Sequence, residues 1–113
     1  MQLKPYPDMV RCLFKTTGMN EQAEAILHAA IGVAGEAGEL LDAVKKVWAY
    51  GKPLDLPNAI EELGDLEFYM EALRQHIGVT REEVLQANQE KLAKRYPNGV
   101  YSDLHAQSRL DKE

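Results

Sequence analysis

Two long stretches of helical periodicity, residues 21–50 and 56–77, dominate the sequence, and a segment containing Gly51 and Pro53 joins them. Apolar side chains recur every three or four residues in both stretches, which is the spacing of one face of an α-helix. Gly51 and Pro53 are typical of a helix end, and Asp55 is a suitable N-cap for the second helix. Because the connection is short, the two helices are expected to run antiparallel as a hairpin.

Shorter helices are predicted on both sides of this hairpin. Pro7 and Asp8 favour a helix that begins there and extends to about Lys15. Asn20 is a suitable N-cap for the helix over 21–50, and Gly78 is a suitable left-handed stop after the helix over 56–77.

A fourth helix is predicted over residues 81–96, where Thr80 and Glu83 form a capping box and Pro97 ends the helix. No stretch alternates apolar and polar residues as a strand does. The prediction is therefore an all-α fold built on the hairpin. It forms one domain over 1–113, with a core at about 21–97 and a polar tail, 98–113, that is ordered against a partner.

Composition excludes several classes of function. The net charge of −5 argues against binding a nucleic-acid polymer. No apolar run approaches the roughly 20 residues that a membrane span needs, and the first ten residues lack the hydrophobic region of a signal peptide. The single cysteine, Cys12, cannot form an internal disulfide, which favours the cytoplasm, and we expect it to be a small buried residue.

Three glycines, Gly32, Gly35 and Gly38, interrupt the first long helix, and each costs roughly 1 kcal/mol relative to alanine. Gly32 falls on the same side of the helix as Glu36 and Glu39, so we expect its missing side chain to leave room for a metal ion and a ligand. Gly35 and Gly38 lie further round, where they would admit a neighbouring helix. Helix packing alone is the alternative explanation for all three.

Glu36 and Glu39 match a second acidic pair, Glu62 and Asp65, on the second long helix. At about 100° per residue, each pair borders the apolar stripe of its own helix in the same way. In an antiparallel hairpin the pairs also stand level, since the midpoint of residues 36 and 65 and that of residues 39 and 62 are both 50.5. Four neighbouring carboxylates repel one another unless a cation compensates them, and oxygen ligands suit Mg²⁺, with Mn²⁺ possible.

The same spacing also occurs where no site is expected. Glu21 with Glu24, and Glu39 with Asp42, are three residues apart and are interpreted as solvated faces. A di-iron carboxylate bundle is excluded because it needs histidine three residues after glutamate on two helices, which this sequence lacks.

The segments "GEAGEL" and "EELGDL", which contain the two acidic pairs, resemble those of the MazG-like all-α nucleoside triphosphate pyrophosphatases. The downstream "NQEKLAKRYP" is similar to another segment of that family, so that the resemblance covers roughly residues 21–97. It implies a helical bundle completed by oligomerisation, as a homodimer or homotetramer. It also implies Mg²⁺-dependent cleavage of a nucleoside triphosphate to the monophosphate and pyrophosphate. A related dUTP/dUDP hydrolase or phosphoribosyl-ATP pyrophosphatase is an alternative, and so is a non-enzymatic helical module that only oligomerises or binds a partner helix.

The sequence departs from many relatives at Gly35, where they have a glutamate directly before the first motif. If that glutamate activates water in those relatives, Glu36 or Glu61 could replace it here. The catalytic candidates are therefore Glu36, Glu39 and Glu61, and the metal-ligand candidates are Glu36, Glu39, Glu62 and Asp65.

Five further residues are candidates for substrate binding. Asn88, Lys91 and Arg95 share one face of the fourth helix, where they either contact phosphates and sugar or form a polar surface row. His28 either contacts a base or sugar, or it is solvated or pairs with Glu24. Trp48 either stacks on a base or packs in the core, and its place in the apolar stripe favours the core.

Overall fold

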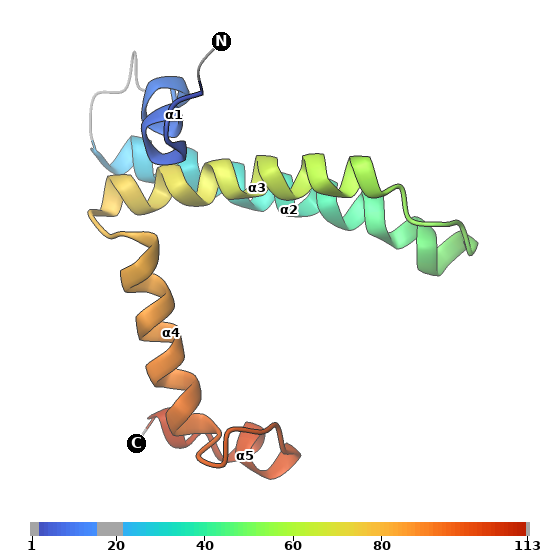
Figure 1. Ribbon diagram of the computed structural model, residues 1–113, viewed down its shortest axis with the longest axis vertical. Coiled ribbons are helices and arrows are strands. Elements are labelled where there is room, and N and C mark those ends of the chain that lie inside the picture. The colour runs from blue at the N-terminus through green and yellow to red at the C-terminus, as the bar shows by residue number, and fades with distance from the viewer. Residues whose placement is uncertain (1–2, 16–21, 113) are drawn as a thin grey trace. The chain divides into compact units, whose positions relative to one another are not determined.

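The computed structural model describes residues 3–15 and 22–112, and every regular element in these ranges is helical (Figure 1). The elements are α1 (Tyr6–Leu13), α2 (Gln22–Tyr50), α3 (Leu56–Ile77), α4 (Arg81–Arg95), α5 (Asp103–Ser108) and the 3₁₀ helix η1 (Leu110–Lys112). The all-α prediction is therefore confirmed. The chain divides into two compact units, one up to Gly78 and one from Val79 onward, and each is described by itself.

The predicted helix ends are largely confirmed. The Asp55 carboxylate accepts a hydrogen bond from the backbone N–H of Asn58, and Gly78 ends α3 in the left-handed conformation at φ 79°. Thr80 and Glu83 form the expected capping box. Helix α1 begins one residue earlier than predicted and ends at Leu13 rather than near Lys15. The predicted cap at Asn20 lies outside the described residues.

Helices α2 and α3 lie side by side along the first unit, in the register expected from the short turn (Figure 1). Ala29 and Ala72, which share the midpoint 50.5 with the acidic pairs, are both buried. Gly32 and Tyr69 share that midpoint too, and a Cβ atom added to Gly32 would overlap the Tyr69 ring. The expectation that Gly32 leaves room for a metal ion was therefore wrong, because the Tyr69 ring fills that space. Gly35 and Gly38 have no side-chain or tertiary neighbour within 4 Å of an added Cβ among the described residues.

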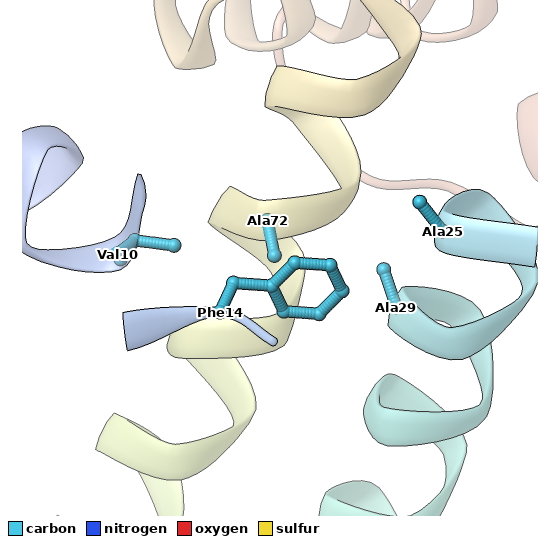
Figure 2. Packing of buried hydrophobic residues seen from close by; sticks show 5 residues of the cluster. All are labelled: Val10, Phe14, Ala25, Ala29 and Ala72. Atoms are coloured by element: carbon cyan, nitrogen blue, oxygen red, sulfur yellow. The ribbon is translucent and has the colours of Figure 1, made fainter. Parts of the chain in front are cut away.

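A small core joins α1 to the hairpin. Val10 of α1 and Phe14, the residue directly after this helix, pack against α2 and α3 (Figure 2). Their neighbours are Ala25 and Ala29 of α2 and Ala72 of α3. Phe14 also stacks on the His28 imidazole, with ring centroids 4.7 Å apart.

Cys12 is exposed rather than buried as predicted. It lies two residues, or about 200° of helical rotation, from the buried Val10, and therefore faces away from the hairpin.

Much of the apolar stripe on the hairpin is solvent-exposed in the single chain. Trp48 is 88% exposed, so its predicted core position was wrong. In the hairpin register the first residue of α3, Leu56, lies opposite residue 45, which leaves the last turn of α2 with no helix across from it. Other large apolar residues that are exposed on the two helices include Leu41, Val44, Val47, Leu56, Ile60 and Leu63.

In the second unit the C-terminal segment folds back on α4. Asp111 of η1 accepts hydrogen bonds from Nε and Nη2 of Arg95, at 2.9 and 3.3 Å, and its side chain is only 1% exposed. These bonds, with those from Arg109, hold the pKa of Asp111 well below its usual range. The tail that was expected to need a partner thus contains two short helices, and it contacts α4 within its own chain.

The packing at Gly32 predicts opposite effects for two alanine substitutions in one helix. Gly32→Ala should lower the free energy of unfolding by about 1–3 kcal/mol, because the new methyl group displaces the Tyr69 ring. Gly35→Ala is the matched control and should leave it unchanged or raise it by up to about 1 kcal/mol, since alanine favours the helix. Urea unfolding followed by circular dichroism measures both, and equal effects would contradict the packing described.

Candidate metal centre

Three carboxylates converge where α2 passes α3. Glu36 of α2 and Glu62 and Asp65 of α3 each offer an oxygen, and these oxygens all lie within 4.8 Å of one another. Glu62 and Asp65 are three residues apart and so share one face of α3, while the hairpin register brings Glu36 level with Asp65. Three of the four predicted metal ligands therefore form one group.

The pKa of Glu62 is raised above its ordinary value. Partial desolvation is the main cause, and the negative charges of Asp65, Glu39, Glu36 and Glu61 add to it in that order. The carboxylates thus repel one another across the hairpin, and a bound cation would relieve this repulsion.

Glu39 is close enough to raise the pKa of Glu62, but it is not one of the three residues whose oxygens converge. Glu61 is exposed and also contributes to the repulsion. By contrast, Asp42, which follows Glu39 by three residues, forms an exposed ion pair with Lys45 at 3.0 Å. This agrees with its interpretation as part of a solvated face.

A hollow of about 330 Å³ lies directly beside the three carboxylates. Glu36 and Asp65 form its polar side, and Leu13, Phe68 and Tyr69 form its apolar side. An acidic edge next to an apolar wall suits a ligand that has both a charged and an apolar part, and the volume is at the lower end of that of small-molecule sites.

The sequence reasoning missed the three apolar residues of this hollow. Tyr69 could have been found, since it follows Asp65 by four residues and therefore shares its face of α3. It also stands opposite Gly32 in the hairpin register, where a glycine leaves space for a large ring. Leu13 could not have been found in this way, because no local pattern shows where α1 docks.

His28 lies in an aromatic group rather than at the acidic cluster. Its ring stacks on Phe14 and meets Tyr69 edge-on at 6.0 Å. Its Nδ1 atom is buried without a hydrogen-bond partner in the described structure. His28 therefore contacts Tyr69, one of the residues that line the hollow, and does not line the hollow itself.

Of the other substrate-binding candidates, the exposed Trp48 lies in the first unit and the remaining three lie in the second. Asn88 and Lys91 are exposed on α4, while Arg95 is partly buried against Asp111. That ion pair uses two of the five N–H donors of the Arg95 guanidinium, one on Nε and one on Nη2.

Residues 21–100 match the family described as the MazG nucleotide pyrophosphohydrolase domain. The match covers most of the chain and includes α2, α3, α4 and the three converging carboxylates, so the chain belongs to this family. No curated protein and no solved structure matches the chain. In the part of the chain that the structure describes, no helix has the length and apolarity required to cross a membrane.

The repulsion at Glu62 predicts how the stability of the metal-free protein depends on pH. A pKa that is raised in the folded state stabilises the protein below the ordinary glutamate value of 4.5, and this contribution is lost as pH rises through the raised pKa. Glu62→Gln should therefore stabilise the protein more at neutral pH than at pH 4.5.

Asp42→Asn is the matched control of opposite sign. Its hydrogen bond from Lys45 lowers the pKa of Asp42, so that this substitution should destabilise the protein at neutral pH and lose its effect as pH falls. Urea midpoints in EDTA at several pH values measure both. The same pH trend in the two variants would contradict the electrostatics described.

Proposed function

We propose that this protein is a Mg²⁺-dependent nucleoside triphosphate pyrophosphohydrolase, which cleaves a ribo- or deoxyribonucleoside triphosphate to the monophosphate and pyrophosphate. The observation that carries the proposal is the convergence of Glu36, Glu62 and Asp65 beside the hollow, in a chain of the MazG family. The carboxylates supply the phosphate end of the site and the hollow supplies space for the nucleoside.

The donor set fits a hard divalent cation. All three converging ligands are carboxylates, which suit Mg²⁺ and Mn²⁺ better than metals that prefer nitrogen or sulfur. The charges that add to desolvation in raising the pKa of Glu62 support the same conclusion, because they are negative charges that lack compensation. When bound, the metal neutralises phosphate charge and makes water more acidic.

The chain's own groups then have separable roles. Hydrolysis adds water across the bond between the α-phosphorus and its bridging oxygen, so one group must accept a proton from the water. Glu36 lies at the edge of the hollow and is the first candidate for this base, with Glu39 and Glu61 as alternatives on the two helices. Glu62 and Asp65 remain ligands on α3.

The charges of Lys91 and Arg95 suit the outer phosphates of a nucleotide, and the Asn88 amide suits a sugar or phosphate oxygen. The exposed Trp48 is available for stacking on a base, of this chain's substrate or of a partner's. His28 contacts Tyr69, which lines the hollow.

The bare apolar stripe of the hairpin supports assembly as a homodimer or homotetramer. Large apolar residues such as Leu41, Val44 and Ile60 are more than two-fifths exposed in the single chain. A Cβ atom added at Gly35 or Gly38 would also meet open space. A second copy that packs there would bury the stripe and enclose the carboxylates.

A panel of nucleoside triphosphates tests the activity. Phosphate release should appear with Mg²⁺ only when inorganic pyrophosphatase is added, because cleavage between the α- and β-phosphates produces pyrophosphate. Including dUTP, dUDP and phosphoribosyl-ATP identifies the related hydrolases that the sequence left open. Direct phosphate release from a triphosphate without the auxiliary enzyme would contradict the proposed bond cleavage, whereas dUDP would release phosphate directly when the same bond is cleaved.

Substitution of the converging acids tests the site. Glu36→Gln, Glu62→Gln and Asp65→Asn should each lower kcat/KM at least about 100-fold, while Asp42→Asn on the exposed face should not. Glu39→Ala shows whether the fourth acid belongs to the site. If Glu39 is a metal ligand, the variant should lose activity while its fold is retained. A folded oligomer that hydrolyses none of the panel would favour the non-enzymatic helical module instead.

A further inference from the structure

Helix α1 has two sides that face different parts of the first unit. Val10 and Phe14 pack into the core against α2 and α3 (Figure 2). Leu13 lies between them in sequence and contributes little to that core, since it is 65% exposed, yet it lines the hollow beside Glu36 and Asp65. The position of α1 therefore decides whether Leu13 closes its side of the hollow.

One polar side chain ties α1 to α3. Nε2 of Gln75 donates a hydrogen bond to the backbone carbonyl oxygen of Pro7, at 2.9 Å, and another to Oε2 of Glu71, at 2.6 Å. An amide nitrogen has two hydrogens, so both of its donors are used. Among the side-chain hydrogen bonds of the described residues, the one to Pro7 is the only one that joins α1 to α3.

A buried charged group holds Gln75 in this orientation. Glu71 and Arg74 are 8% and 7% exposed, and Nε of Arg74 donates to Oε1 of Glu71 at 3.0 Å. Arg74 also pairs with Glu67 at 2.5 Å. The other oxygen of Glu71 accepts the bond from Gln75, so the arginine fixes the carboxylate that in turn fixes the amide.

Tyr6, in the first turn of α1, lies close to the same group. Burial raises the pKa of its hydroxyl, and the charges of Glu67 and Glu71 raise it further. These groups take no part in the three-carboxylate cluster, and a buried ion pair is not by itself evidence of stabilisation. The contact of this group with α1 is the hydrogen bond from Gln75 to the Pro7 carbonyl.

We propose that Gln75 is a positioning residue for the substrate: by holding the Pro7 carbonyl, with Glu71 and Arg74 behind it, it keeps α1 docked so that Leu13 closes one side of the hollow. This inference rests on the proposed function, because it takes the hollow as the substrate site. Gln75 acts through α1 and does not touch the reacting atoms.

The proposal makes a specific kinetic prediction. If substrate binds well only when α1 is docked, the apparent affinity falls in proportion to the docked fraction, whereas turnover of the bound complex is unchanged. Gln75→Leu keeps the size of the side chain but removes both donors. It should raise KM for the preferred nucleoside triphosphate about threefold to tenfold, with kcat changed by less than about twofold.

Three variants separate positioning from a general loss of stability. Gln75→Lys restores N–H donors toward Pro7 and Glu71 and should return KM most of the way to the wild-type value. Asp8→Asn breaks an exposed pair with Arg11 inside α1 and should leave KM unchanged. Ala59→Gly weakens α3 sixteen residues from Gln75 and should lower stability without changing KM.

Hydrogen exchange of the α1 peptide gives an independent readout, and it should be faster in Gln75→Leu than in the wild type and in Ala59→Gly. An unchanged KM in Gln75→Leu and in the double variant with Val10→Ala would overturn the proposal. An equal rise of KM in Ala59→Gly would overturn it as well. A wild-type protein that hydrolyses no nucleotide would instead refute the proposed function, so the two failures are distinguishable.

Discussion

The register of α2 against α3 is the constraint on which the rest of the first unit depends. Small residues let the two helices approach at Ala29 and Ala72, and the Gly32 position accepts the Tyr69 ring one turn further along. The next level of the same register brings Glu36 to Asp65. A shift of a single residue would rotate every one of these pairs by about 100° on one helix, and the carboxylates would separate as the packing failed. The packing therefore fixes the acidic cluster, although the cluster itself opposes folding through partial desolvation and repulsion, which together raise the pKa of Glu62.

This arrangement explains why the candidate site lies in the middle of the hairpin. At the end away from the turn, α1 covers the two helices and buries a compact core (Figures 1 and 2). Toward the turn the stripe is bare, and Trp48 and Leu41 are 88% and 66% exposed. Glu36 stands at the border between the covered and the bare halves, where Leu13 is the last residue of α1. A site at such a border has one wall built by its own chain and leaves its other side open to a ligand.

Local signals were sufficient for the helices, and for the acidic cluster once the hairpin was inferred. The cap at Asp55, the stop at Gly78 and the capping box at Thr80 each depend on a few adjacent residues, which is why the sequence predicts them. Glu36 and Asp65 stand at the same height along the hairpin, and this follows from the short turn and the helical rise alone. Burial was harder to predict, because it depends on what packs against a residue from elsewhere in the chain. Trp48 lies in an apolar stripe, yet α3 starts too late to reach it, and Cys12 lies on the side of α1 that faces away from the hairpin. Gly32 was placed on the correct side, but the ring that fills its space comes from α3.

The bare half of the hairpin has a consequence for how the site could work. Two helices can bury only a narrow strip between them, and the apolar arc of each helix is wider than that strip. The chain therefore has more apolar surface than its own elements cover, at the place where its carboxylates stand. If a second copy covers that surface, as we propose, metal and substrate would bind in a site whose dielectric constant falls on assembly, and attraction between the cation and the carboxylates would strengthen. Assembly and metal binding would then support each other, since the cation removes the repulsion that enclosure of four acidic side chains would otherwise increase.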